Sequence, residues 1–246
     1  MRVSSGYATP LDILPGYPES RLLIAVDHAS NHVPAGIELG VPRHLLNDHI
    51  AIDLGAGALA RGIAARLGGH SILGHVSRLV IDLNREPDAA ALIPESSDGH
   101  VIPGNFGLVQ AERERRLVTL HRPYHDAITE LIDHEHIEFI VSVHSFTPAL
   151  ASRAEARPWP VGILYNGDDR AAAVAIALLR ARGINVGDNQ PYSGRVLNYT
   201  MNRHAEARRL PYLGFEVRQD ELLMPDDIAR WAKFLSEIVA ETRARL

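Results

Sequence analysis

The sequence predicts an α/β fold of three layers, in which a mixed, largely parallel sheet lies between two layers of helices. Short apolar runs alternate along the chain with longer segments that have helical periodicity. These runs are apolar at nearly every position, as strands that are buried on both faces usually are. Neither an internal repeat nor a linker-like stretch interrupts the chain, so residues 1–246 are expected to form one domain.

The first part of the chain supplies an arm, a central strand and a helix. Residues 1–20 are rich in Gly, Pro and Ser, and we expect an extended arm that packs over the body. Every residue of 22–26 is apolar, which predicts the first central strand. Apolar residues recur with helical spacing over 49–67, and Gly68 and Gly69 end that predicted helix.

The middle of the chain combines strands with a long loop and a long helix. The apolar runs 71–76 and 79–83 are the next strand candidates. Prolines, glycines and small polar residues fill 86–105, and a loop of that length is usually functional or mobile. Residues 110–134 have the pattern of a helix that is bent or interrupted at Pro123.

The last part of the chain continues the alternation of strands and helices. Asp168 or Asp169 is expected to cap the next helix, and the closing helix is amphipathic. A turn-rich segment, 187–194, separates two of these elements. The predicted strands are 139–143, 161–165, 184–186 and 212–217, and the predicted helices are 169–182, 196–209 and 225–246.

The composition excludes several classes of function. The formal net charge of −5 gives no reason to expect a nucleic acid or an anionic membrane as partner. The chain has no cysteine, so disulfides and thiol nucleophiles are excluded and a metal site must use nitrogen and oxygen donors. We find no signal peptide and no apolar stretch near the roughly 20 residues of a membrane span, which predicts a soluble cytoplasmic protein.

Two histidines follow buried strands at positions that favour metal binding. His28 comes shortly after the run 22–26, and His144 comes directly after 139–143. The carboxyl ends of parallel strands meet at one edge of an open sheet, so both imidazoles are expected there. A well-fixed neutral imidazole is a good zinc ligand. The alternatives are a loop histidine that caps backbone groups at the first position and a satisfied core histidine at the second.

Glu216 interrupts the apolar run 212–217. A buried glutamate is costly unless it is paired or functional. Beside a metal it would act as general base on a bound water and then as proton donor to a leaving amine. The alternative is a buried ion pair with Arg218, which lies two positions along the strand and therefore on the same face; Arg218 is also a candidate substrate-binding residue.

Four polar residues surround the predicted strand 79–83: Arg78, Asp82, Asn84 and Arg85. Arginine offers a two-pronged donor for a carboxylate, and asparagine adds a directional donor. That combination suits recognition of a small acidic molecule. The alternative is a structural network in which Asp82 pairs with an arginine.

Further candidates are weaker, and motifs of other chemistries are missing. His49 and Asp53 would lie one turn apart on the same face of the predicted 49–67 helix. Tyr192, in the turn-rich segment, is placed to cover a substrate. The sequence has no GxSxG elbow, no P-loop and no HExxH pair, and its Gly-Ala-Gly at 55–57 does not follow a strand.

Taken together, these motifs resemble the N-formylglutamate amidohydrolase family over about residues 20–225. They follow the family's order: Asp27-His28-Ala29-Ser30-Asn31 with Pro34, His49 with Asp53, Ser77-Arg78-Leu79-Val80 with Asp82-Asn84-Arg85, Val143-His144-Ser145-Phe146 and Glu216-Val217-Arg218-Gln219-Asp220. The family is similar to the zinc-carboxypeptidase-like hydrolases, which implies a phosphorylase/hydrolase-like fold. The resemblance implies hydrolysis of N-formyl-L-glutamate to glutamate and formate in histidine catabolism.

The resemblance also implies a site. His28 and His144 would bind Zn²⁺ or another divalent metal, with Glu216 as the catalytic base. In the carboxypeptidase-like relatives a glutamate ligand follows the first histidine by three positions; here that position is Asn31, and Asp53 is the other candidate for the third ligand.

The remaining roles concern the substrate, a small acidic N-acyl amino acid. Asn84 and Arg85 resemble the carboxylate-binding pair of the relatives, with Arg78 in support and as stabiliser of the oxyanion. One alternative is another carboxypeptidase-like deacylase or exopeptidase. Another is a metal-free protein that keeps the fold and binds a small acid through the arginines.

Overall fold

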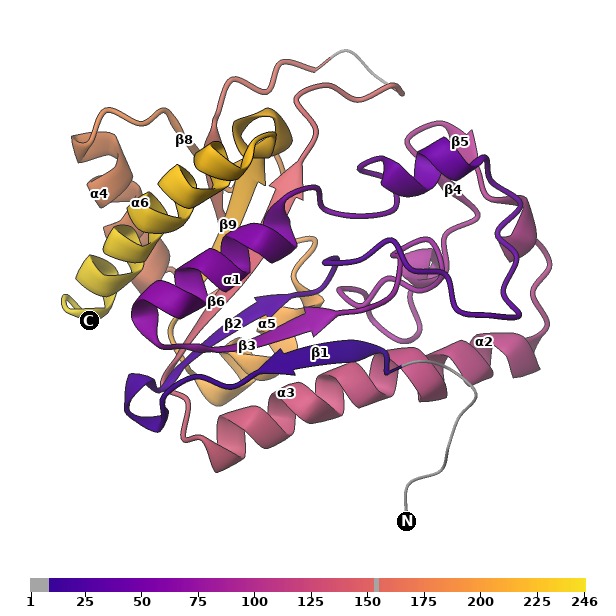
Figure 1. Cartoon of the computed structure of the whole chain (residues 1–246), viewed down its shortest axis with the longest axis horizontal. Coiled ribbons are helices and arrows are strands. Elements are labelled where there is room, and N and C mark those ends of the chain that lie inside the picture. The colour runs from indigo at the N-terminus through magenta and orange to yellow at the C-terminus, as the bar shows by residue number, and fades with distance from the viewer. Residues whose placement is uncertain (1–8, 153–154) are drawn as a thin grey trace.

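A computed structural model describes residues 9–152 and 155–246 and contains a seven-stranded sheet between two helical layers (Figure 1). The predicted three-layer α/β/α architecture with a mixed sheet is confirmed. The strand order is β1-β3-β2-β6-β9-β7-β8. The strands are β1 (Leu11–Leu14), β2 (Leu22–Val26), β3 (His70–Gly74), β6 (Phe139–Phe146), β7 (Val161–Leu164), β8 (Val186–Asp188) and β9 (Tyr212–Arg218).

The centre of the sheet is parallel and its flanks are mixed. Strands β3, β2, β6 and β9 pair in parallel, so their carboxyl ends lie at the same edge. β1 joins one side antiparallel to β3, which makes part of the predicted arm an edge strand. On the other side β7 runs antiparallel to β9, and β8 pairs in parallel with β7.

Each face of the sheet has its own apolar core. On one face, Leu22, Ile24 and Val26 of β2 pack with three helices, α1 (Ala56–Leu67), α4 (Arg170–Ala181) and α6 (Pro225–Arg243). On the other, Leu23 and Ala25 pack with α3 (Arg122–His134) and α5 (Tyr199–His204). The alternation of strand side chains between two buried faces explains why the run is apolar throughout.

The predicted helix 49–67 is shorter than expected, because α1 begins only at Ala56. Gly55, just before it, has φ +78°, and a Cβ there would lie 2.6 Å from the Leu222 Cβ. The chain therefore turns sharply before the helix. His49 and Asp53 consequently lie in a loop and do not share a helix face.

The predicted strand 79–83 is also wrong, because this segment forms consecutive turns. The Ser77 Oγ accepts a hydrogen bond from the Leu79 N–H at 3.3 Å, and the Ser77 carbonyl accepts one from the Val80 N–H at 2.9 Å. Local side-chain acceptors of this kind compete with strand pairing. The turns leave Asp82 and its neighbours beside the sheet edge.

Other helical predictions hold with changes. The segment 110–134 comprises α2 (Gln110–Arg116), a π-helical turn (Leu117–His121) and α3, with Pro123 in the first turn of α3. The predicted helix 196–209 is reduced to α5 and a short 3₁₀ turn. The loop 86–105 contains a small hairpin of β4 (Ser96–Ser97) and β5 (His100–Val101). Among the described residues, none of the helices is both long and apolar enough to cross a membrane.

Three buried histidines fill the space between α3 and α5. The His125 Nδ1 lies 2.9 Å from the His204 Nε2, and their rings stack with centroids 5.2 Å apart. Burial, helped by the charge of Arg203 and opposed by that of Asp27, lowers the pKa of His204 to about 3. Burial together with His121 and His204 lowers the pKa of His125 well below its usual value.

These shifts predict that the protein loses stability as the pH falls below about 6.5. In the unfolded chain both histidines titrate near 6.5, whereas in the folded protein His204 stays neutral down to about 3. The unfolded state therefore binds more protons in this window, and stability decreases through it. Between pH 6.5 and 5.0, the free energy of unfolding of His204→Gln should fall by about 1.6 kcal/mol less than that of wild type, because glutamine does not titrate. Chemical unfolding at the two pH values would measure both changes. Equal decreases in the free energy of unfolding of the two proteins would show that His204 does not stay neutral in the folded protein.

Candidate active site

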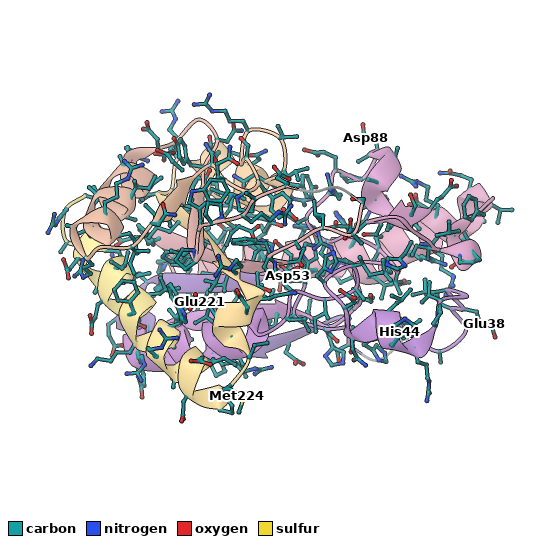
Figure 2. All side chains as sticks on the ribbon, turned by 90° about the horizontal axis from the view of Figure 1, so that it is seen from above. Glu38, His44, Asp53, Asp88, Glu221 and Met224 are labelled. Carbon is teal, nitrogen blue, oxygen red and sulfur yellow. The ribbon has the colours of Figure 1, made fainter. Side chains whose placement is uncertain are left out.

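The carboxyl ends of β2, β6 and β9 open into a cavity of about 440 Å³. His28 follows β2, His144 lies on β6 and Glu216 lies on β9, and all three line this cavity. The volume is typical of a site for a small molecule. Seen from above, Asp53 lies in the interior of the molecule, whereas Glu38 and Asp88 lie at its periphery (Figure 2).

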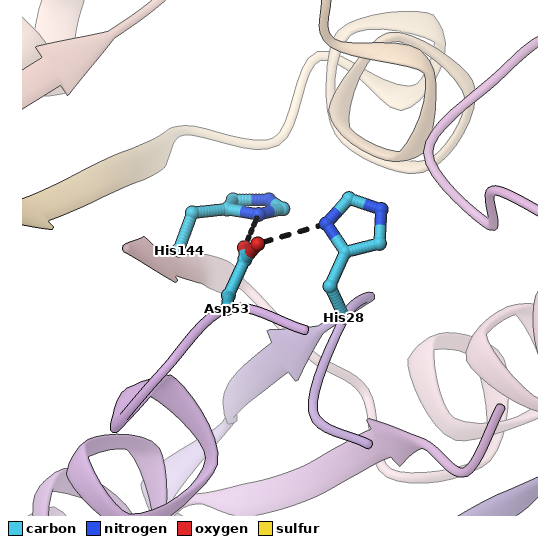
Figure 3. Close-up of side chains that lie close together, drawn as sticks. All are labelled: His28, Asp53 and His144. Atoms are coloured by element: carbon cyan, nitrogen blue, oxygen red, sulfur yellow. Dashed lines mark hydrogen bonds and ion pairs between the residues drawn. The ribbon is translucent and has the colours of Figure 1, made fainter. Parts of the chain in front are cut away.

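His28, Asp53 and His144 form one buried group (Figure 3). The Asp53 Oδ2 lies 2.8 Å from the His144 Nδ1 and 3.3 Å from the His28 Nδ1. All the candidate ligand atoms lie within 4.8 Å of one another, so this group could hold a metal ion. Each side chain is at most 9 % exposed, which excludes most of the water that would compete for the ligands.

The loop that carries Asp53 is fixed by contacts with both histidine segments. The Asp53 N–H donates to the His28 carbonyl at 3.0 Å. The Ser145 hydroxyl donates to the Leu54 carbonyl at 2.8 Å, and the Ser77 hydroxyl donates to the Ala51 carbonyl at 3.0 Å. The carboxylate is therefore held in position independently of a metal.

The second nitrogen of each histidine faces a further carboxylate. The His28 Nε2 lies 2.7 Å from the Asp82 Oδ1, and the His144 Nε2 lies 3.3 Å from the Asp27 Oδ2. Such a carboxylate fixes the proton on Nε2 and leaves Nδ1 for a metal, the arrangement that commonly orients metal-binding histidines. Both Nδ1 atoms here face the same Asp53 oxygen.

The surrounding charges favour ionised groups throughout this cluster. Burial opposes ionisation of His144, but its contacts with Asp27 and Asp53 raise its pKa well above the usual value. Burial likewise opposes ionisation of Asp53, but the charges of His28 and Arg78 hold its pKa well below the usual value. The cluster thus carries its own compensating charges.

Glu216 lies beside this group and is chemically distinct from it. It pairs in register with His144 on the adjacent parallel strand, and its Oε2 is buried without a hydrogen-bond partner. Burial and the charge of Asp53 raise the pKa of Glu216 to about 7, although the charges of His144, Arg78 and His28 oppose the shift. A carboxyl group that exchanges a proton near neutral pH is suited to general acid–base chemistry.

The predicted arginine cluster partly lines the cavity and partly stabilises it. Arg78 donates to the Asp53 Oδ1 at 2.9 Å and to the Asp82 Oδ2 at 3.4 Å. Asn84 and Arg85 line the cavity, and the Arg85 Nε lies 3.5 Å from the Asp82 Oδ2. The structure therefore contains both the network and the cavity-lining donors that the sequence left as alternatives.

The structure does not bring every predicted residue into the site. The Asn31 amide donates to the Asn47 Oδ1 at 2.8 Å, so of the two candidates for a third ligand it is Asp53 that accompanies the histidines. The Arg218 guanidinium contacts Asp220 at 2.7 Å and the Arg157 carbonyl at 3.0 Å, and it does not line the cavity. The alternative pairing of Arg218 with Glu216 is not formed.

A known protein family matches most of the chain. The family model of N-formylglutamate amidohydrolase matches residues 20–223. The chain belongs to this family. It is accordingly a hydrolase that acts on amide bonds, as the motifs predicted. No curated protein matches it in sequence.

Solved structures resemble this family member over nearly its whole length. A gene product from Agrobacterium tumefaciens is 30% identical, with a TM-score of 0.90 over 97% of this chain and 96% of that one. The N-formylglutamate amidohydrolase from Ralstonia eutropha JMP134 is 20% identical, with a TM-score of 0.75 over 97% of this chain and 100% of that one. A bacteriophage poly-gamma-glutamate hydrolase shares the fold at 14% identity, with a TM-score of 0.50 over 100% and 94% of the two chains.

Two residues that the sequence motifs do not single out support the cavity-lining side chains of this amidohydrolase-family chain. Asp27 directly follows an apolar strand, which is a signal of the same kind as that of His28. Thr200 gives no signal, because it lies inside the predicted helix 196–209, far along the chain from both residues that it contacts. Its N–H donates to the Asn84 Oδ1 at 2.9 Å, and its hydroxyl donates to the Asp27 Oδ1 at 2.8 Å.

Proposed function

We propose that the protein is a metal-dependent amidohydrolase that removes the formyl group from N-formyl-L-glutamate or a closely related N-acyl acidic amino acid. The observation that carries this proposal is the convergence of two imidazole nitrogens on one carboxylate oxygen, beside a buried glutamate with an unpartnered oxygen. Membership of the family supports the substrate class.

The residues present suit zinc. His28, Asp53 and His144 would hold it, since two imidazoles and a carboxylate leave a position open for water or substrate in catalytic zinc sites. For zinc bonds near 2.05 Å, adjacent ligand atoms of a tetrahedron lie about 3.3 Å apart. The observed separations of 2.8 and 3.3 Å to the Asp53 Oδ2 are close to that spacing.

A bound zinc would lower the pKa of a water molecule towards ~7 and polarise the acyl oxygen. Glu216 would take a proton from the attacking water as it adds to the acyl carbon. The same carboxyl group would then give that proton to the amine as the carbon–nitrogen bond breaks. Arg78, which lines the cavity, would stabilise negative charge on the acyl oxygen.

Asn84 and Arg85 would bind the acidic end of the substrate. The Asn84 Oδ1 already accepts the Thr200 N–H, so the amide presents its two N–H donors elsewhere. Arg85 adds a delocalised positive charge that suits a carboxylate. Tyr192 lines the same cavity and receives a hydrogen bond from the Arg157 guanidinium at 3.3 Å, which would hold its ring against a substrate.

The proposal is tested by measuring turnover of N-formyl-L-glutamate against the N-formyl derivatives of glutamine, leucine and aspartate, with purified zinc-loaded protein. We expect the glutamate derivative to be preferred over the neutral ones by about 10- to 100-fold in kcat/KM, the worth of one charge-assisted hydrogen bond. Turnover of other N-acyl groups with equal efficiency would favour a broader deacylase. Binding of the acids without turnover or metal would favour the binding-protein alternative.

Replacement of Arg85 should remove that preference. Arg85→Gln is expected to raise KM for N-formyl-L-glutamate by about 10- to 100-fold and to change KM for the glutamine derivative much less. The matched control is Arg66→Gln, because Arg66 is exposed on α1. An equal effect of Arg85→Gln on both substrates would contradict a role in binding the acidic end.

A further inference from the structure

Three side chains of one helical rod hold the segment that carries Asp82, Asn84 and Arg85. The rod is α2, the π-helical turn and α3, which together cross one face of the sheet (Figure 1). The Arg116 Nη1 donates to the Val80 carbonyl at 3.0 Å. The His125 Nε2 lies 2.9 Å from the Leu83 carbonyl, and the His121 Nε2 lies 3.0 Å from the Arg85 carbonyl.

The π-helical turn explains how these three side chains reach one segment. Arg116 and His121 are five positions apart, and in a regular α-helix such residues lie about 140° apart around the axis. The π-helical turn at Leu117–His121 widens the helix at this point and brings them to the same side. His125 follows His121 by four positions and shares its face. All three residues are at most 3 % exposed.

The hydrogen bonds fix the protons of the two histidines. A carbonyl oxygen only accepts, so the Nε2 atoms of His121 and His125 both carry hydrogen. The His125 Nδ1 is then free to accept from the His204 Nε2 at 2.9 Å. The result is a series of hydrogen bonds in one direction, in which His204 donates to His125 and His125 donates to the Leu83 carbonyl. It ends at the residue between Asp82 and Asn84.

We propose that His121 and His125 are positioning residues for substrate binding, acting through the backbone carbonyls of Arg85 and Leu83 on either side of Asn84. The two bonds fix the peptide planes that flank Asn84, and Thr200 fixes its amide. The same segment carries Asp82, whose Oδ1 accepts from the Asn84 N–H at 2.9 Å and faces the His28 Nε2. One rigid segment thus links the substrate donors to the metal-binding group.

This inference rests on the proposed function, because it assigns Asn84 and Arg85 to the substrate. The test compares Gln and Met at each histidine, since both are unbranched side chains of similar length and only Gln donates a hydrogen bond. The four variants are His121→Gln, His121→Met, His125→Gln and His125→Met. The readouts are KM and kcat for N-formyl-L-glutamate, the Kd for L-glutamate, and hydrogen exchange of peptides that cover residues 82–85.

We expect each Met variant to raise KM and Kd by about tenfold, the cost of one lost buried hydrogen bond, with kcat within threefold of wild type. Each Gln variant should stay within about threefold in all three constants. Exchange at residues 82–85 should be faster in the Met variants than in the Gln variants. Equal KM, Kd and exchange in the Gln and Met variants would overturn the inference, even if all four proteins lost thermal stability.

The experiment separates this inference from the proposed function. A wild-type protein that neither turns over N-formyl-L-glutamate nor binds L-glutamate would refute the proposed function, and hydrogen exchange would still decide whether the histidines order the segment. If one Met variant does not fold, the other pair decides, because the two histidines hold neighbouring carbonyls. In an Asn84→Ala background, His125→Met should add less than twofold to KM, since the substrate donor that His125 positions has been removed.

Discussion

Glu216→Gln should reduce kcat for N-formyl-L-glutamate by about 10²- to 10⁴-fold, the usual contribution of a general acid–base residue. The amide has nearly the same shape as the carboxyl group but cannot take up the proton of the attacking water. Folding should be preserved, because the Oε2 that is replaced has no hydrogen-bond partner to lose. Steady-state kinetics with the metal content measured on the same sample would check this expectation.

The control for that variant is Glu237→Gln, which makes the same chemical change at an exposed position on α6. It should keep wild-type kinetics and metal content. Full turnover by Glu216→Gln would show that another group moves the proton. A parallel loss of metal and turnover would instead place Glu216 among the ligands.

The strand pattern made the centre of the site predictable from the sequence. Parallel strands end at the same edge, so residues that close two buried runs must lie close together if the runs are neighbours. Here β6 and β9 are neighbours, and His144 lies opposite Glu216 in their register. His28 joins them because β2 is the next strand on the other side of β6.

The loops made the rest of the site unpredictable. Asp53 was expected on a helix, but the left-handed turn at Gly55 places it in a loop that reaches both histidines. Hydrophobic periodicity carries no information about such a turn, because the turn depends on the close approach of Gly55 to Leu222, which is distant in sequence. The strand prediction for 79–83 was wrong for a related reason. Ser77 supplies local hydrogen-bond acceptors, so the buried residues form turns instead of pairing in a strand.

The choice between Asn31 and Asp53 depends on the same long-range contacts. The spacing of three positions after His28 points to Asn31, whereas spacing gives no information about Asp53, because the chain between 28 and 53 includes several turns. Arg78 is what distinguishes Asp53, since it anchors one carboxylate oxygen at 2.9 Å and leaves the other facing the histidines. Arg78 lies 25 positions from Asp53, so the local sequence pattern around Asp53 cannot predict this contact.

His144→Ala should abolish both metal binding and turnover. Only two of the three ligands would remain, so the loss of metal affinity should exceed the roughly 10- to 100-fold that is typical when an outer partner of a ligand is removed. Wild-type protein that has been stripped with a chelator should regain turnover when zinc is added back, whereas the variant should not. Metal analysis by mass spectrometry, paired with the kinetic assay, would measure both effects.

His134→Ala is the matched control, because the His134 side chain is 86% exposed near the end of α3. Removal of His144 also takes away the imidazole that faces Asp27 and leaves Asp53 with His28 as its only imidazole partner, so some loss of stability is expected in the variant. The metal measurement distinguishes this from a structural role: a folded His144→Ala protein that binds zinc as tightly as wild type would exclude His144 as a ligand. The His144 Nε2 faces Asp27 and the His144 Nδ1 faces Asp53. We expect Nδ1 to be the nitrogen that binds the metal.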